Sequence, residues 1–547
     1  GIGNAQNVNI PDANFKAYLV GNTQINTNGD AEIQVSEASS HNGIISCADL
    51  NIADLTGIEA FTALTELTCF NNQLTSLDVS QNTALGLLNC DGNELTSIDV
   101  TQNTALGGLY CEGNQLTSID VTQNTALGVL MCGNNQLTSL DVTNNTDLYY
   151  FYCIGNQLTS LDVSQNTALF EFRCSVNQLT SLDVSQNTAM WRLWCWDNQL
   201  TNLDLIGATA LEYLDCKTNQ LTSLDATQNT ALTSLECENN QLTSLDLIGA
   251  TALEILNCDT NQLTSLDVSQ NTALTGLTCS NNQLTSLDVS QNTALTGLFC
   301  GNNPLTSLDV SQNTALTFLW CYDNTLTNLD VTQNTALTFL WCYDNTLTNL
   351  DVTQNTALEL LFCLGNQLTS LDVTQNTALT QLYCFDNQLT SLDVSQNTAL
   401  ESLWCYDNQL TCLNVKNGNN SNMVDSSFIA NNNPNLTCVE VDDVAYSTAN
   451  WTSIDAGASF STNCNNDCSV GINEANTPSL SIYPNPSNTG LIQLNTSIVN
   501  SDINVYSIEG KQINFTQSNN VIDISDNEKG VYLISIDGIV IRYVYQD

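Results

Sequence analysis

Two kinds of residue with reactive side chains, cysteine and aspartate, recur at one fixed spacing in this chain of 547 residues. Seventeen of its 22 cysteines lie 21 residues apart, from Cys69 to Cys405, and Cys47 precedes them by 22. An aspartate recurs 16 times at the same spacing, from Asp78 to Asp393. Thiolates bind metals and carry redox chemistry, and neighbouring carboxylates bind cations or act as acid and base. Each row is therefore a candidate chemical site.

The cysteine row suits a structural role better than a chemical one. Equivalent residues on neighbouring strands lie about 4.8 Å apart with parallel side chains. A disulfide needs Cβ atoms about 3.8 Å apart, and zinc needs ligands that converge on one point. The spacing therefore predicts that these cysteines are small apolar core residues rather than a metal or redox site.

The aspartate row could be compared with the catalytic pair of a glycosidase, whose carboxyl groups lie about 5–5.5 Å apart in retaining enzymes. Such a pair needs two different environments, whereas these aspartates have nearly identical sequence neighbours. We therefore expect a solvated acidic face with loosely held cations. The chain has one histidine, His41, which disfavours histidine-based catalysis. The sequence predicts that the protein is not an enzyme.

The charge balance excludes two classes of partner. Lys and Arg number 8 against 56 Asp and Glu, which gives a net charge of −48. Such a chain repels nucleic acid and anionic lipid. No run of 18 apolar residues occurs, so we expect no transmembrane segment.

The two rows belong to a repeat that must position them. One unit reads LTELTCFNNQLTSLDVSQNTA, from Leu64 to Ala84, and 17 units follow one another to about Asn420. Each unit holds two half-patterns, LxxLxCxxNxL and LxxLDVxxNxx, that match the leucine-rich-repeat strand signature. Each asparagine should turn inward and bond backbone groups of the turn. We predict a mainly β fold: a parallel-strand solenoid with two strands per coil, forming two sheets around a thin core.

This pattern resembles the nested leucine-rich repeats called IRREKO-type, over residues 47–420. The resemblance implies a right-handed solenoid whose usual role is binding or adhesion. The chain departs from the family pattern by placing cysteine where leucine is common.

The two sides of each coil differ in variability. Outward residues of the second half repeat Ser-Asp-Ser/Thr, as in Ser76, Asp78 and Ser80, whereas those of the first half change from coil to coil. Structural positions should be alike in every coil, while positions that read a ligand should differ. Aromatic residues on the variable side are the candidate ligand contacts, for an extracellular glycan or protein: Trp194, Trp196, Phe318, Trp320, Tyr322, Phe339, Trp341, Tyr343, Phe362, Tyr383, Phe385, Trp404 and Tyr406. The alternatives are that these rings only stiffen the sheet, or that a cap or another domain covers them.

Residues 1–46 read as an N-terminal cap. Phe15 and Leu19 are spaced for a short helix that opens after Pro11. The loop that follows resembles an EF-hand, with oxygen ligands at Asn26, Asn28, Asp30 and Glu37, and predicts a weak calcium site. It departs from that motif in having asparagine first and alanine at the sharp turn, so an ordinary polar turn is the alternative.

Residues 421–468 read as a C-terminal cap, followed by a small, polar linker over 469–479. The cap is similar to those of secreted Bacteroidetes leucine-rich-repeat proteins, and this resemblance implies a disulfide between Cys438 and Cys464. Four cysteines allow three pairings, so the sequence leaves the pairing of Cys412 and Cys468 open. A disulfide would fit an oxidising, extracellular location.

Residues 480–547 alternate apolar and polar residues between turns, which predicts a small antiparallel β-sandwich. This segment resembles the type A C-terminal sorting domain of the type IX (Por) secretion system. The matching residues are Tyr483, Pro484, Asn485, Pro486, Gly490, Gly510, Lys529, Gly530, Val531 and Tyr532. The resemblance implies Bacteroidetes origin, and as partners the outer-membrane translocon, its shuttle protein and a sortase. A generic β-sandwich binding module is the alternative.

Taken together, these features predict a secreted cell-surface protein that acts as a ligand-binding or adhesion rod. A structural spacer without a specific ligand is the first alternative. An enzyme that acts on polysaccharides is the second.

Overall fold

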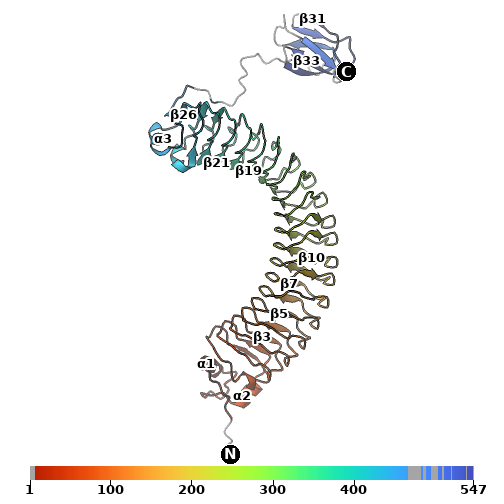
Figure 1. Cartoon of the computed structure of the whole chain (residues 1–547), viewed down its shortest axis with the longest axis vertical. Helices are drawn as coiled ribbons and strands as arrows, with labels where there is room; N and C mark the ends of the chain where they lie inside the picture. Colours follow the sequence, from red (N-terminus) through yellow and green to blue (C-terminus); the bar gives the residue numbers. More distant parts are fainter. Residues whose placement is uncertain are drawn as a thin grey trace, which may run out of the picture. The chain divides into compact units, whose positions relative to one another are not determined.

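The computed structural model describes residues 6–465, 468, 482–483, 488–494, 503–507, 511–518, 520–536 and 539–545. It divides into two compact units, Gly1–Ser469 and Val470–Asp547 (Figure 1). The linker expected at 469–479 lies outside the described residues. Each unit is described by itself.

A parallel sheet of 19 strands, counted over the described residues, runs the length of the first unit. Each strand pairs with the equivalent strand of the next coil, as Leu67 of one strand pairs with Leu88 of the next. In order along the stack these strands are β1 (Ile44–Ser46), β2 (Glu66–Thr68), β3 (Leu87–Asn89), β4 (Gly108–Tyr110), β5 (Val129–Met131), β6 (Tyr150–Tyr152), β7 (Glu171–Arg173), β9 (Arg192–Trp194), β11 (Tyr213–Asp215), β13 (Ser234–Glu236), β15 (Ile255–Asn257), β16 (Gly276–Thr278), β17 (Gly297–Phe299), β18 (Phe318–Trp320), β19 (Phe339–Trp341), β20 (Leu360–Phe362), β21 (Gln381–Tyr383), β23 (Ser402–Trp404) and β25 (Phe428–Ile429). The sheet thus begins before residue 47 and continues past residue 420.

The core between the two sides of the coil holds the repeated leucines, valines and cysteines. In a typical coil, Leu64, Leu67, Cys69, Leu74 and Val79 are fully buried. The cysteines from Cys47 to Cys405 are free thiols, all buried. Burial raises the thiol pKa, for example to about 12 at Cys300, so these groups stay protonated and unreactive at neutral pH. The geometry agrees with a core role for the cysteine row.

The first-half asparagines join neighbouring coils inside the core, as their position predicted. Asn114 donates from Nδ2 to the carbonyls of Cys90 (3.0 Å) and Cys111 (3.2 Å). Its Oδ1 accepts the Leu95 amide at 3.0 Å. One side chain thus satisfies backbone groups of two successive coils, and the same bonds recur along the stack.

The second half of each coil is less regular than two full sheets would require. Among the described residues, second-half strands pair as β8 (Ser181–Asp183) with β10 (Asn202–Asp204), β12 (Ser223–Asp225) with β14 (Ser244–Asp246), and β22 (Ser391–Asp393) with β24 (Cys412–Asn414), the last continued by β26 (Cys438–Glu440) and β27 (Ser459–Ser461). Asp78 and Asp99 form an isolated parallel bridge, and the other described second halves form no strand.

The second-half asparagine explains where these strands pair. In most coils it lies between neighbouring turns: Asn313 donates to the carbonyls of Val289 and Asn292, each at 2.9 Å. The coils of β10, β14 and β24 have Ala208, Ala250 and Gly418 at this position. At Ala208 and Ala250 no side-chain amide lies between the coils, and the backbones form ladder bonds. At β24 the neighbouring Asn417 still donates to the Asn397 carbonyl at 3.0 Å, so the missing amide explains only the first two pairs.

Glycine permits this approach. A Cβ on Gly207 would lie 1.5 Å from the Ser185 carbonyl oxygen, and one on Gly249 would lie 1.6 Å from that of Thr227. Other coils carry glutamine or asparagine at the position of Gly207, so a Gly-Ala pair closes this side of the stack at β10 and at β14, whereas the β24 coil pairs with Asn417 and Gly418 at these positions.

The ends of the first unit are closed by short elements. At the N-terminal end these are α1 (Ala13–Gly21), α2 (Val35–Ser40) and the 3-10 helix η1 (Ile58–Ala60). Asp12 caps α1 by accepting the amides of Asn14 and Phe15, and Phe15 and Leu19 are fully buried, which confirms the helix expected there. At the C-terminal end these are η2 (Asn420–Asn422), η3 (Asp425–Ser427) and α3 (Val444–Asn450).

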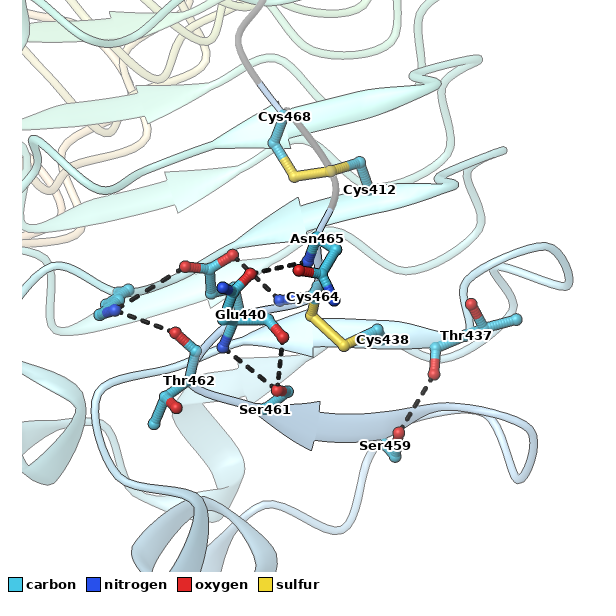
Figure 2. Close-up of a disulfide and its surroundings, with 12 residues drawn as sticks. Cys412, Thr437, Cys438, Glu440, Ser459, Ser461, Thr462, Cys464, Asn465 and Cys468 are labelled. Carbon is cyan, nitrogen blue, oxygen red and sulfur yellow. Dashed lines mark hydrogen bonds and ion pairs between the residues drawn. A yellow bond between two sulfur atoms is a disulfide. The ribbon is translucent and has the colours of Figure 1, made fainter.

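Two disulfides brace the C-terminal end of the first unit: one lies within the cap, and the other joins the cap to the last coil (Figure 2). Cys438 pairs with Cys464, the pair that the resemblance implied, with Cα atoms 5.8 Å apart. Cys412 pairs with Cys468, with Cα atoms 5.4 Å apart, which resolves the pairing that the sequence left open. Nearby, Lys416 donates to the Thr462 carbonyl at 2.9 Å and lies 3.8 Å from Glu440. The chain after β27 is thus held to the stack.

The second unit holds two small antiparallel sheets, as expected for a β-sandwich. One contains β28 (Ile482–Tyr483), β29 (Leu491–Leu494), β32 (Val521–Asp523) and β31 (Thr516–Ser518), and the other contains β30 (Ile503–Ser507), β33 (Gly530–Ile536) and β34 (Ile539–Tyr545). Ile492, Val505, Ile522, Ile534 and Tyr543 are fully buried between them.

We expect Asn313→Ala to loosen its coil, because the carbonyls of Val289 and Asn292 each lose the donor from the next coil and keep only a backbone amide of their own turn. Amide exchange in residues 289–336 should be about 30-fold faster, equivalent to about 2 kcal/mol of local stability. Adding Gln312→Gly should restore part of the protection, because the pair then imitates Gly207–Ala208. The exposed Gln312→Ala is the control and should not change exchange. Unchanged exchange in Asn313→Ala would show that the amide does not hold the coils.

Candidate ligand-binding face

The candidate site is the variable face, defined as the outward side chains of the 19-stranded sheet. Because the strands pair in register at every 21st residue, equivalent outward residues form rows along the stack. The sequence-predicted aromatic residues therefore come together in three adjacent rows.

The middle row contains six rings in consecutive coils. Trp320 stacks on Trp341 with ring centroids 4.1 Å apart and planes 5° apart. The stack continues through Trp341–Phe362 (5.3 Å), Phe362–Tyr383 (4.4 Å) and Tyr383–Trp404 (4.4 Å). At the other end Phe299 meets Trp320 edge to face, at 4.7 Å and 79°.

The two flanking rows contain shorter stacks. Phe318 stacks on Phe339 at 4.9 Å on one side. On the other side Tyr322 stacks on Tyr343 at 4.7 Å, and Phe385 stacks on Tyr406 at 4.2 Å. Leu364 separates these two pairs in the same row.

These rings lie on the surface of the sheet and outside the core. Those of the middle row are half-buried, and Phe318 is 38% exposed. The faces of most rings are covered by the neighbouring rings, so the row presents only parts of the ring edges to solvent, and the indole nitrogens of Trp320 and Trp341 are buried. A sugar that stacks on a flat ring face therefore does not fit the interior of the row, and fits only where a row ends.

A second aromatic group surrounds Trp194. The guanidinium of Arg173 lies between the Tyr152 ring (4.5 Å) and the Trp194 ring (4.4 Å), and donates to Glu171 from Nε at 2.9 Å and from Nη2 at 2.7 Å. Trp194 also contacts Tyr213, with centroids 5.1 Å apart. Trp196 lies half-buried on the same face.

Sequence reasoning passed over part of this group. Arg192 lies over the Trp191 ring at 3.7 Å, and Phe170 stacks on Trp191 at 5.1 Å. Arg173, Arg192 and Lys217 are the only basic residues between Lys16 and Lys416, and all three lie on the variable face. The occurrence of these three basic residues in three successive coils was the sequence signal that could have revealed this cluster.

Carboxyl groups on this face are partly desolvated. Burial raises the pKa of Asp215, Glu236 and Glu238, which cluster around Lys217; the Lys217 ammonium lies 3.1 Å from Asp215. Burial raises the pKa of Asp91 to about 6, and the adjacent Glu112 carboxylate adds to the rise. The variable face thus carries carboxyl groups that are costly to ionise.

The aspartates of the opposite side behave differently. Asp78 accepts the Ser80 amide at 2.9 Å, and Asp120 accepts the amide and hydroxyl of Thr122 at 3.0 and 2.6 Å. These bonds lower the pKa of both carboxyls. The pKa thus moves in the same direction at Asp78 and Asp120, whereas a catalytic acid and base need contrasting environments.

The N-terminal loop uses its oxygen atoms internally. Glu37 Oε1 accepts the amides of Thr27 and Asn28 at 2.9 and 3.1 Å, and Oε2 accepts the Gln34 amide at 3.0 Å. Asn26 Oδ1 accepts the Gly29 amide, and Asp30 Oδ1 accepts the Glu32 amide. As arranged, these residues do not fit a preformed calcium cage, and no group of three or more His, Cys, Asp or Glu in the described part of the chain is placed to hold a metal. Calcium binding stays a prediction.

Comparisons with known proteins give matches for both units of the chain. The family model of the secretion system C-terminal sorting domain matches residues 481–542. Internalin J of Listeria monocytogenes serotype 4b (strain F2365) is 39% identical over 75 residues, which cover 14% of this chain and 8% of that protein.

Two solved structures are similar to the chain. The functional domain of InlJ from Listeria monocytogenes, described as including a cysteine ladder, is 29% identical with a TM-score of 0.48, and the comparison covers 99% of this chain and 98% of that one. The leucine-rich-repeat protein LIC12759 of Leptospira interrogans is 22% identical with a TM-score of 0.51, covering 69% and 92%.

The parallel stack with its buried asparagines is a leucine-rich-repeat solenoid. The chain is a leucine-rich-repeat protein that carries a C-terminal sorting domain of the type IX secretion system. This domain indicates secretion to the cell surface or the extracellular space. No helix among the described residues is long and apolar enough to cross a membrane.

The structure places the sorting residues only in part. Gly490 has a φ of 69°, and Gly530, Val531 and Tyr532 lie in β33. Tyr483 lies in β28. Four of the expected sorting residues lie outside the described residues: Pro484, Asn485, Pro486 and Gly510.

We expect Asp91→Asn to raise the melting temperature at pH 7.5 and to leave it unchanged at pH 4. The folded-state pKa of Asp91 is raised, so stability falls as the pH rises from about 4 to 6, and the amide removes this cost. Asp78→Asn is the control: its carboxyl has a lowered pKa and stabilises above pH 4, so the amide should slightly destabilise. A loss of stability in Asp91→Asn at pH 7.5 would contradict the assigned cost.

Proposed function

We propose that this protein is an adhesion or ligand-binding rod that contacts its ligand through the variable face. The observation that carries the proposal is the contrast between the two sides of the coil. One side repeats Ser-Asp-Ser/Thr almost unchanged, with exceptions such as Ile206 and Ile248, whereas the other displays aromatic rings in register over six consecutive coils, half-exposed on the sheet.

Physical considerations support this role. Aromatic side chains bury large areas at low entropic cost, and they dominate binding energy in many interfaces. Rings held by their neighbours are already ordered, so ligand binding does not have to immobilise them. The pre-arranged row is therefore a suitable contact surface.

A structural spacer is the second candidate, and one observation favours it. The rings of the middle row stack on each other at 4.1–5.3 Å, so that they also stabilise the sheet. A row that only stiffens the rod would need no ligand.

The sorting domain supports the proposed partners of secretion. We propose that the translocon, its shuttle protein and a sortase act on residues 480–547, and that the protein comes from a Bacteroidetes species. The domain itself depends on Gly490, because a Cβ there would lie 2.6 Å from the Ser525 Cα.

The double variant Trp341→Ala and Trp404→Ala tests the binding role. We expect at least about a tenfold loss of retention on glycan and protein arrays, since two anchor rings are removed. Asp330→Ala with Asp351→Ala on the opposite side is the matched control and should bind normally. Circular dichroism should show that both variants keep their strands. Unchanged retention with intact folding would favour the spacer.

We expect Gly490→Ala to reduce secretion severalfold in a host with a type IX system, because both its positive φ and the contact with Ser525 exclude a side chain. Ser518→Ala is the control and should be secreted normally, since Ser518 is exposed in β31 and is not one of the matching sorting residues. Secretion of Gly490→Ala at the normal level would show that this turn tolerates a side chain.

A further inference from the structure

The row of rings on the variable face ends abruptly beside coils with small side chains. The outward residues of β16 and β17 include Gly276, Thr278 and Gly297, and the next outward positions are Ser280 and Gly301. The step from small residues to rings leaves a hollow of about 320 Å³. This volume falls in the range of about 300–1,000 Å³ typical of small-molecule sites.

One wall of the hollow is aromatic. Phe299 is turned edge-on to Trp320 at 79°, which interrupts the parallel stacking seen in the rest of the row. Tyr322 lies over Gly301, where a Cβ would come within 2.7 Å of the ring. The absence of a side chain at Gly301 thus sets the position of the wall.

The opposite rim is polar and internally braced. Asp259 Oδ1 accepts Nδ2 of Asn281 at 3.1 Å, and Oδ2 accepts the Thr260 hydroxyl at 2.9 Å. Asn281 Oδ1 accepts Nδ2 of Asn302 at 2.6 Å. The Asp259 carboxylate contributes to the raised pKa of the Tyr322 phenol, which is consistent with their facing each other across the hollow. Thr278 and Ser280 complete the lining.

The chemistry of the lining selects a ligand class. No lysine or arginine occurs between Lys217 and Lys416, so an anionic ligand would meet carboxylate without a compensating cation. The rim offers acceptors for hydroxyl donors, and the aromatic wall suits the slightly positive C–H face of a ring. A neutral, hydroxyl-rich ring satisfies both demands.

We infer that this hollow is a binding subsite for a pyranose ring of an uncharged glycan. The inference rests on the proposed binding role of the variable face and names the ligand of one part of it. Asp259 and Asn281 bond the sugar hydroxyls, the Tyr322 ring over Gly301 packs on the C–H face of the sugar, and Phe299 and Trp320 close the side of the hollow. Trp320 alone belongs to both the hollow and the continuous stack.

The test uses the full chain and a panel of neutral probes, namely cellohexaose, xylohexaose, mannohexaose and maltohexaose, measured by calorimetry. Thr278→Trp extends the ring row into the hollow and should weaken binding at least about tenfold. Thr68→Trp places the same residue at the equivalent strand position of β2, away from the hollow, and should bind normally. Asp259→Ala should weaken binding about tenfold through loss of a charged acceptor.

The outcomes separate this inference from the proposed function. Binding lost in Thr278→Trp and kept in Thr68→Trp supports the subsite. If no neutral probe binds, if only peptides bind, or if Thr278→Trp binds normally, the subsite is overturned. Trp341 and Trp404 do not line the hollow. If array binding still depends on these two residues in such a case, the proposed binding role of the variable face stands even though the subsite is overturned. If array binding does not depend on Trp341 and Trp404 either, both the subsite and the proposed binding role of the variable face are contradicted.

Discussion

The structure depends on buried asparagine amides that bond the backbone of two successive coils at once. A single coil of 21 residues does not contain enough hydrogen-bond partners for its own inward-facing carbonyls and amides. Asn114 and its equivalents supply the missing donors and acceptors from the next coil. Each coil is therefore complete only when stacked, which fixes the register of the whole sheet.

That register determines what the surface can do. Because every strand is placed by the same amide bonds, a ring at one outward position meets the ring 21 residues later, as Trp320 meets Trp341. Rings added coil by coil form a continuous stack that stabilises the sheet and leaves only edges exposed. A ligand can reach a ring face where the sequence breaks the row, as it does between Gly301 and Tyr322. Binding chemistry is thus concentrated at discontinuities.

The repeated part of the structure could be predicted from the sequence because its causes are local and periodic. The spacing of leucine, cysteine and asparagine specified the parallel strands, the buried thiols and the inward amides. The sequence predicted a second sheet along the whole stack, but its strands pair in only a few coils, because the pairing at β10 and β14 depends on Ala208 and Ala250 removing an amide from between two coils. Three further features were not predicted: the covered ring faces, the placement of Arg173 between two rings, and the hollow. They depend on the directions of side chains and on positions that lack a large side chain. The repeat pattern of the sequence does not specify side-chain directions.

The strand-to-strand bonds of the first unit point along the stack, and this direction has a mechanical consequence. A load applied between the two ends would pull these bonds apart in series, so that coils would detach one after another. Each detached coil would release roughly 70 Å of extended chain, from 21 residues at up to about 3.4 Å each. Because many equivalent coils can detach one by one, stepwise lengthening would limit the tension on an anchored molecule. The coils that remain stacked would keep their variable face.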